Sequence, residues 1–209
     1  MIDFFNYQKS YGQHQVLSIS EQTIPDGIHW IKGQNGSGKS TLLKSIAGII
    51  PFKGDIQVNG EGLKQNPVEV RRKVTYSEAE PVYPVFLTAS DILNFVAQTR
   101  NYSRSEMNNI MDYFGVDSFK NQAIGGFSAG MLKKLSLCIA FCGEVPWILL
   151  DEPFAFIDSE TETNLIMFIE QKVKQGVNFI ITSHHELARE DLVFKGIYVI
   201  RNHKLQIEK

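Results

Sequence analysis

The chain has 209 residues, of which 43% are hydrophobic and 21% charged, and its formal net charge at pH 7 is -2. This length can bury one well-developed core with a small subdomain, and the charge balance lacks the basic excess of a nucleic-acid-binding protein, so we expect no nucleic-acid partner. No apolar run approaches the ~20 residues of a membrane span, and the start of the chain does not resemble a signal peptide. We therefore expect a cytoplasmic protein, which would need a partner to act at a membrane.

The chain begins with two predicted strands, residues 2–7 and 15–20, in which apolar and polar side chains alternate. Tyr11 lies in the predicted turn between them. Its ring could stack on a nucleotide base, although an aromatic residue in a turn is by itself more often an ordinary surface residue. A Pro-Asp-Gly turn at residues 25–27 leads into residues 28–31, an apolar segment that predicts a buried strand.

Residues 33–41, GQNGSGKST, fit the pattern G-x-x-x-x-G-K-[ST] of a phosphate-binding loop. The glycines let successive backbone N–H groups point inward around an anion, and the helix that follows adds the positive end of its dipole. Lys39 supplies a charge for the β- and γ-phosphates, and the hydroxyl of Ser40 can ligate Mg²⁺. The loop therefore predicts a nucleotide site.

A predicted helix over residues 41–48 follows the loop, with an apolar face formed by Leu42, Ile46 and Ile49. After a Pro- and Gly-containing break, residues 55–58 predict a short strand closed by an Asn-Gly turn.

The middle of the chain predicts a strand, a loop and a small helical region. The basic run at residues 71–73 is too short for a nucleic-acid patch and is expected to face solvent. Residues 74–76 predict a strand, and residues 77–86 contain two prolines and predict a loop. Two capping-box patterns then indicate helices within residues 88–125. These pairs are Thr88 with Asp91 and Ser103 with Glu106.

Residues 125–130 are rich in glycine and open another predicted helix. Backbone N–H groups at such a helix start can bind an anion, but Ser128 could equally serve as an ordinary N-cap. Cys138 and Cys142 lie four residues apart on this helix. We expect them to be small buried side chains rather than a disulfide or a metal site.

Residues 147–150 are entirely apolar and end in two acids, Asp151 and Glu152. A fully apolar strand is typical of a parallel sheet covered on both faces, and such sheets bind ligands at the carboxyl ends of their strands. Asp151 can hold Mg²⁺ through water, and Glu152 can orient the attacking water. The alternative, two solvated carboxylates at a strand end, is less favoured beside a phosphate-binding loop.

The last third predicts a helix over residues 159–174 and a buried strand over residues 177–182. His184 follows that strand and could reach a γ-phosphate, although a lone histidine there would more often be structural. Residues 197–200 and 205–207 predict a hairpin that ends the chain.

In this order, these residues resemble the nucleotide-binding subunit of ATP-binding cassette (ABC) transporters over essentially the whole chain. Residues 33–41 are similar to the Walker A motif, and residues 148–152 to Walker B followed by the catalytic glutamate. Residues 127–131, FSAGM, are similar to the LSGGQ signature, which in that family binds the γ-phosphate of ATP held by the opposite subunit. The remaining matches are the end of the D-loop (residues 157–158), the switch histidine (His184) and the aromatic residue that stacks on adenine (Tyr11).

The resemblance implies an α/β fold: a P-loop NTPase core with a mostly parallel sheet, an N-terminal antiparallel β-subdomain and a small α-helical subdomain. One ABC ATPase domain would span residues 1–209, with the core and β-subdomain in residues 1–87 and 126–209 and the helical subdomain in residues 88–125. The implied ligands are ATP and Mg²⁺. The implied catalytic residues are Glu152 and His184, and the implied metal ligands are Ser40 and Asp151. The implied nucleotide-binding residues are Tyr11, Asn35, Gly36, Ser37, Gly38, Lys39, Ser40, Thr41, Ser128 and Gly130.

The chain departs from the family pattern at two motifs. In the signature, Ala129 replaces the middle glycine and Met131 replaces the glutamine. In the Q-loop, Ala79 falls at the position of the usual Gln or Glu, flanked by Glu78 and Glu80. Which of these three residues acts as the Q-loop residue is left open, and we expect that one of the two glutamates supplies any acidic group near Mg²⁺.

The resemblance also implies partners and a mechanism. Two nucleotide-binding subunits, expected to be identical, sandwich two ATP molecules head to tail. Closure excludes water and aligns Glu152, a water molecule and the γ-phosphorus. The helical subdomain passes the motion to a separate membrane-spanning subunit, which would hold this chain at the inner face of the cell membrane.

Three other classes of protein share part of this pattern. ATPase heads of the DNA-repair type carry a long coiled coil between Walker A and the signature, where this chain has prolines and no sustained heptads. A small kinase or GTPase would leave the signature unexplained, and the guanine-binding motif is missing. A soluble ABC ATPase of cofactor assembly or translation remains the alternative.

Overall fold

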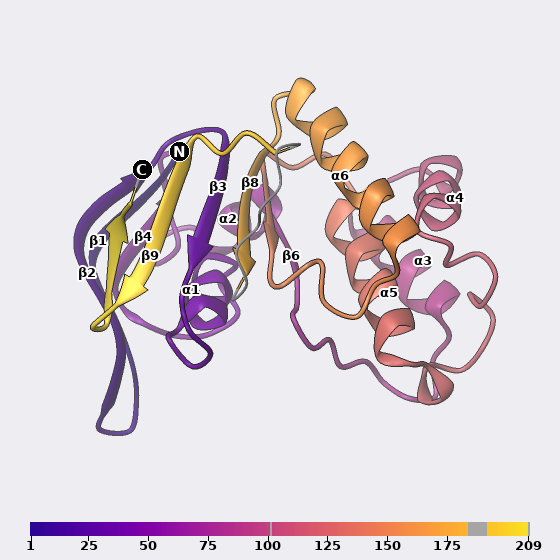
Figure 1. The fold of residues 1–209 in the computed structure, drawn as a ribbon, viewed down its shortest axis with the longest axis horizontal. Coiled ribbons are helices and arrows are strands. Elements are labelled where there is room, and N and C mark those ends of the chain that lie inside the picture. The colour runs from indigo at the N-terminus through magenta and orange to yellow at the C-terminus, as the bar shows by residue number, and fades with distance from the viewer. Residues whose placement is uncertain (101, 184–191, 209) are drawn as a thin grey trace.

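The computed structural model describes residues 1–100, 102–183 and 192–208. Two sheets and a group of helices form the molecule, with the sheets at one end and helices α3 to α6 at the other (Figure 1). The first sheet is antiparallel and has the strand order β2-β1-β4-β5, and the second has the order β10-β9-β3-β8-β7-β6. This arrangement confirms the predicted α/β class.

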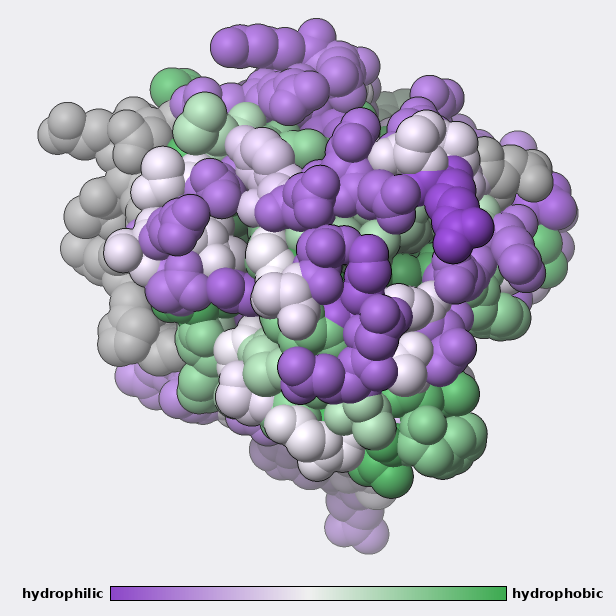
Figure 2. Space-filling model, turned by 90° about the vertical axis from the view of Figure 1, so that its right-hand side faces the viewer, coloured by the Kyte–Doolittle hydropathy of each residue, from purple (hydrophilic) through white to green (hydrophobic). Residues whose placement is uncertain are grey.

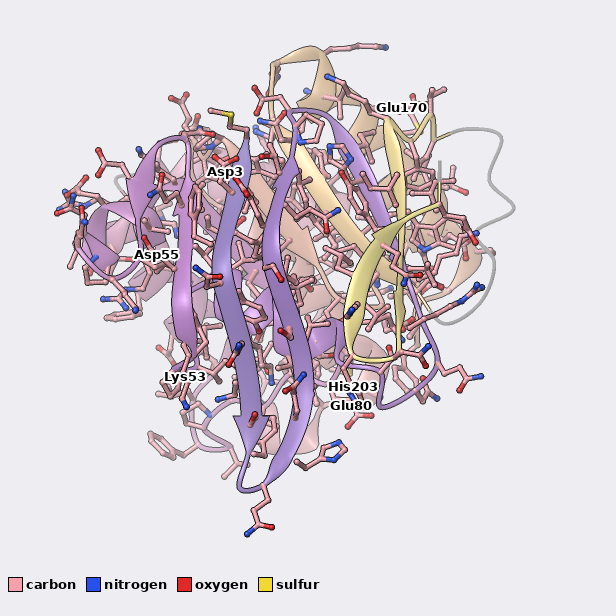
Figure 3. All side chains as sticks on the ribbon, turned by 90° about the vertical axis from the view of Figure 1, so that its left-hand side faces the viewer. Asp3, Lys53, Asp55, Glu80, Glu170 and His203 are labelled. Carbon is pink, nitrogen blue, oxygen red and sulfur yellow. The ribbon has the colours of Figure 1, made fainter. Side chains whose placement is uncertain are left out.

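The first sheet contains β1 (Ile2–Tyr11), β2 (His14–Ile24), β4 (Lys53–Val58) and β5 (Glu61–Gly62). Its outer face carries charged side chains, among them Asp3, Lys53 and Asp55 (Figure 3). β1 and β2 are longer than predicted, and Tyr11 is the last residue of β1 rather than a turn residue. The additional residues near the turn are largely exposed, so they do not show the alternation that marks a half-buried strand.

The second sheet is parallel except for its C-terminal hairpin. Its strands are β3 (Ile28–Lys32), β6 (Val74–Ser77), β7 (Trp147–Leu150), β8 (Asn178–Ser183), β9 (Gly196–Arg201) and β10 (Lys204–Ile207). Strand β7 explains why these segments are apolar on both faces. Trp147 and Leu149 pack into one core, and Ile148 and Leu150 pack into the other.

The two cores lie on opposite faces of this second sheet. One core fills the space toward the first sheet and encloses α1 (Lys39–Ile46) through Leu42, Leu43 and Ile46. The other core joins the sheet to α3 (Ala89–Thr99), α4 (Arg104–Tyr113), α5 (Ala129–Phe141) and α6 (Ser159–Lys174). Both faces of the second sheet are therefore covered, and the ends of its strands lie between the layer that contains the first sheet and α1 and the layer formed by α3 to α6.

Helix ends follow their local chemistry closely. Thr88 and Ser103 both cap helices in complete capping boxes, as predicted. The helix α2 (Pro67–Lys73) was not predicted, because Val70 is its one buried residue and gives no apolar period. The placement of Ile49 on a helical apolar face was wrong: α1 ends at Ile46, and Ile49 is 53% exposed.

Within the described residues, no helix is both long and apolar enough to cross a membrane.

Candidate active site

Residues 33–38 leave the central strand β3 and turn into α1. Gly38 caps this helix with φ 106°, in the left-handed region that favours glycine. A Cβ atom at Gly38 would also come within 2.8 Å of Cγ1 of Val16 on β2. A side chain at this position would be both strained and crowded, so the loop geometry depends on glycine here.

Lys39 is the first residue of α1, and its side chain is almost fully buried beneath the loop. Its Nζ donates hydrogen bonds to the carbonyl of Gly33 at 2.7 Å and to the carbonyl of Gln34 at 3.3 Å. The same nitrogen lies 3.5 Å from Oε1 of Glu152. The loop ammonium and the carboxylate that follows β7 therefore meet at one point.

Asp151 is fully buried immediately after β7. Its two carboxylate oxygens each accept a hydrogen bond, from the hydroxyl of Tyr76 at 3.0 Å and from Oγ1 of Thr182 at 2.6 Å. Burial and the adjacent negative charge of Asp151 together raise the pKa of Tyr76, which keeps its hydroxyl protonated as a donor. Strands β6 and β8 thus fix the orientation of this carboxylate from both sides.

Glu152 adopts φ 45°, an uncommon backbone conformation for a residue with a side chain. Its backbone N–H donates to Oγ1 of Thr182 at 3.0 Å. This turn sends the side chain of Glu152 into the cavity beside Lys39 rather than along the strand direction.

A cavity of about 570 Å³ gathers most of the predicted nucleotide site. Its lining residues are Tyr11, His14, Val16, Asn35, Gly36, Ser37, Gly38, Lys39, Ser40, Thr41, Ala79, Glu80, Glu152, Ala155 and Phe156. Tyr11 is about half exposed at the end of β1, so part of its ring is accessible. The cavity therefore joins an accessible aromatic ring, the phosphate-binding loop and a carboxylate.

The predicted signature residues lie elsewhere. Ser128 caps α5 by accepting a hydrogen bond from the backbone N–H of Met131 at 3.2 Å, and neither Ser128 nor Gly130 lines the cavity. A Cβ atom at Gly130 would come within 2.7 Å of the carbonyl oxygen of Phe156. Glycine therefore lets the start of α5 pack against the turn that follows Glu152.

The Q-loop glutamates point to different surroundings. Glu78 forms an ion pair with Lys44 at 3.3 Å, whereas Ala79 and Glu80 line the cavity. Of the two glutamates, Glu80 is the one that the fold brings to the nucleotide site. The choice between them as a metal-site residue stays a prediction.

Some site residues were missed or lie outside the described part of the chain. His184 falls in residues 184–191, which the structure does not describe. Tyr76 and Thr182 were assigned only to strands, because their contacts with Asp151 depend on strand order. Lys133 was also missed, although a lysine within the apolar run of α5 was a signal that could have found it.

Comparison with known proteins identifies the family. The family model described as ABC transporter matches residues 16–155. The ABC transporter ATP-binding protein YybJ of Bacillus subtilis is 30% identical over 198 residues, with 92% of this chain and 88% of YybJ covered. The lantibiotic transport ATP-binding protein SrtF of Streptococcus pyogenes is 28% identical, with 88% of this chain and 80% of SrtF covered.

Two solved structures share the fold. An ATP-binding subunit of an ABC transporter superposes with a TM-score of 0.87 at 24% identity, over 98% of this chain and 87% of the other. A dimeric ATP-binding cassette in a post-hydrolysis state, bound to ADP and Pi, gives a TM-score of 0.83 at 18% identity, over 100% of this chain and 97% of the other. With the family match over more than half of the chain, the resemblance is confirmed. The chain belongs to the ABC transporter family, as an ATP-binding and ATP-hydrolysing subunit that energises transport.

Proposed function

We propose that this chain holds ATP in the 570 Å³ cavity, with the phosphates on residues 35–41 and the adenine against Tyr11. The loop offers inward N–H groups and the start of α1 for the phosphates. Stacking of a base on an aromatic ring contributes about 1–3 kcal/mol in nucleic-acid complexes and tolerates any base. We therefore expect Tyr11 to add affinity without selecting strongly between ATP and GTP.

We propose that Mg²⁺ would be held by oxygen donors from Ser40, which lines the cavity, and from Asp151, which is buried at the end of β7 next to Glu152. Ser40 offers a hydroxyl at the start of α1, and Asp151 offers a carboxylate whose orientation Tyr76 and Thr182 already fix. A carboxylate can accept about four hydrogen bonds, so these two donors leave Asp151 able to bind a metal-coordinated water. Such hard oxygen ligands suit Mg²⁺, which retains several waters and neutralises charge on the phosphates when bound.

The contact between Lys39 and Glu152 carries the proposed chemistry. Their 3.5 Å separation brings a cation for the γ-phosphate and a carboxylate for the attacking water to the same wall of the cavity. Glu152 would accept a hydrogen bond from water and polarise it, while Lys39 stabilises negative charge on the phosphoryl oxygens. The catalytic role of His184 stays a prediction, since this residue lies outside the described residues.

We further propose that two copies of the chain close head to tail around ATP. Ser128 is exposed at the start of α5 and, like Gly130, does not line the cavity of its own chain. A hydroxyl and backbone N–H groups at a helix start suit the γ-phosphate of ATP held by a second copy. The same fold in a dimeric cassette supports this arrangement.

Glu152→Gln tests the proposal, because it keeps the shape of the side chain but removes the carboxylate that polarises water. Mg-ATP binding should survive, hydrolysis should fall by about a hundredfold or more, and ATP-bound dimers should accumulate. Phosphate release measures the fall in hydrolysis, and light scattering with and without Mg-ATP measures the accumulation of dimers.

Ser128→Arg on the Glu152→Gln background is the matched control for the dimer. It should abolish ATP-dependent dimers and leave ATP binding by the monomer nearly intact. A loss of monomer affinity as large as that caused by Lys39→Ala would contradict a contact across the interface. So would dimers that persist in the double variant.

Four exposed apolar residues between β6 and the end of α3 support a membrane-spanning partner. Val82, Val85 and Phe86 in the Q-loop region and Phe95 on α3 are all more than 60% exposed. The face formed by the helices is mostly hydrophilic, with hydrophobic surface gathered toward its lower edge (Figure 2). An apolar group of this kind marks an interaction site when it lies together on a surface.

We propose that the part of the surface that carries these four residues docks onto the membrane subunit. This contact would hold the chain at the inner face of the cell membrane. YybJ and SrtF, whose names place them in transport, support this role over a soluble role in cofactor assembly. Fractionation of cells would test it, because the chain should appear in the membrane fraction when the partner is present.

A further inference from the structure

Lys133 is fully buried in the second turn of α5, at a position where an apolar side chain would cost far less to bury. Burial lowers the pKa of its ammonium to about 8, against the opposing effect of the nearby carboxylates of Asp151, Glu152 and Glu78. A buried cation is strongly destabilising unless it is well hydrogen-bonded. The hydrogen bonds of Lys133 therefore indicate which parts of the chain its buried ammonium stabilises.

The ammonium of Lys133 joins two chain segments that have just left the sheet. Its Nζ donates to the carbonyl of Glu78 at 2.7 Å and to the carbonyl of Asp151 at 2.7 Å. Below this point, β6 and β7 are still connected by the hydrogen bond from the N–H of Asp151 to the carbonyl of Ser77 at 3.0 Å. Lys133 continues the connection where the Q-loop and the Asp151–Glu152 turn begin.

A second contact from the same helix holds the same segment. Ser136, three residues after Lys133, has its Oγ 3.2 Å from the donating N–H of Glu78 and 2.9 Å from Oγ of Ser77. The backbone of Glu78 is thus held to α5 through both its N–H and its carbonyl. Helix α5 also carries Ser128 at its start, five residues and about 7.5 Å of helix rise from Lys133.

We propose that Lys133 is a positioning residue for ATP hydrolysis, which holds the turn containing Glu152, the start of the Q-loop and helix α5 in one frame. This inference rests on the proposed role of Glu152. Lys133 does not line the cavity, so it acts through the segments that it holds. A movement of the Q-loop or of helix α5, which begins at the signature residue Ser128, would therefore also shift the carboxylate of Glu152.

Lys133→Met tests the inference, because it removes the ammonium and keeps an unbranched side chain of similar length. The affinity for Mg-ATP and the KM should stay within about threefold, while kcat should fall at least about tenfold, since a misplacement of about 1 Å in an active site can cost about a hundredfold. Lys133→Arg, which keeps a cation and its donors, should recover part of kcat. Ser136→Ala, which leaves no buried charge, should show the same pattern with a smaller loss.

Cys138→Ala is the control for loss of stability. Cys138 is buried on the same helix, and its thiol lies against the carbonyl of Ile110 on α4. An unchanged kcat in Lys133→Met would overturn the inference, as would a fall no larger than that of Cys138→Ala at equal loss of Tm. If Lys133→Met does not fold, an unchanged kcat in Ser136→Ala together with wild-type kcat in Lys133→Gln overturns it. A wild-type chain that binds Mg-ATP without hydrolysing it would instead overturn the proposed function.

Discussion

His29 is a fully buried histidine in the central strand β3. Its Nε2 donates to the carbonyl of Pro25 at 2.6 Å, and its ring lies near those of Trp147 and Tyr198. Burial lowers the pKa of His29 below its ordinary value, because the surrounding core disfavours the charged ring. The residue therefore connects the stability of the sheet to pH.

Acid should weaken the fold through this residue. Since the pKa of His29 is lower in the folded chain, the unfolded chain binds a proton first as pH falls below about 6.5, and stability is lost there at up to about 1.4 kcal/mol per pH unit. Urea unfolding at about pH 7 and about pH 5.5 should show a larger loss for the wild type than for His29→Gln, which cannot titrate. Equal losses in both proteins would show that His29 does not contribute.

At this scale, the sequence predicts residues whose chemistry is encoded locally. Lys39, Asp151 and Glu152 were found because each lies in a short motif of fixed spacing, and the cavity brings Lys39 and Glu152 together. Tyr76 and Thr182 could not be found in this way. Their hydrogen bonds to Asp151 exist because β6 and β8 flank β7 in the sheet. The order of strands in a sheet cannot be predicted from the sequence of a single strand.

Single elements show where local signals suffice and where they fail. Helix α6 spans the predicted residues, because Asp158 caps it and an apolar period runs along its length. Helix α1 begins at Lys39, two residues before its predicted start, because the left-handed Gly38 is already its cap. The Q-loop has no regular structure, so it could be aligned with the family pattern only by counting residues along the chain. That count puts Ala79, flanked by two glutamates, at the position of the usual Gln or Glu.

Glu80 should supply the acidic group of the Q-loop. Because Glu80 lines the cavity, Glu80→Ala should raise the Mg²⁺ concentration that gives half-maximal hydrolysis severalfold. Glu78→Ala is the matched control, since the side chain of Glu78 pairs with Lys44 instead. Titration of Mg²⁺ at saturating ATP measures both variants. If neither variant changes the titration, the metal site of this chain has no Q-loop side chain.

At the scale of the whole molecule, α3, which carries the exposed Phe95, and the C-terminal hairpin lie on different sides. The division predicted from the sequence into core and helical subdomains remains a proposal. Figure 1 shows α3 and α4 far from the C-terminal hairpin. A substitution on the hairpin can therefore serve as a control for substitutions of exposed apolar residues on the helical side.

Phe86→Ser combined with Phe95→Ser should release the chain from its membrane partner. Binding to urea-washed membranes of the source cells should fall at least tenfold, because each exposed ring loses about 2 kcal/mol of apolar burial at the interface, while ATP affinity should not change. Ile207→Ser is the matched control, since Ile207 is 64% exposed on β10 at the other side of the molecule, close to the 66% of Phe95. Membrane binding that depends on Ile207 and not on the two phenylalanines would contradict the assignment.

The strand order also determines when the nucleotide site can form during synthesis. Strand β3 (Ile28–Lys32), which leads into the phosphate-binding loop, pairs only with β8 (Asn178–Ser183) and β9 (Gly196–Arg201) among the described strands. The first sheet can close early, because β1, β2 and β4 all lie within the first 58 residues. The loop, by contrast, is translated well before β8 and β9, which supply both neighbours of the strand that leads into it. A growing chain on the ribosome therefore cannot assemble its nucleotide site until the residues of β8 and β9 have been translated.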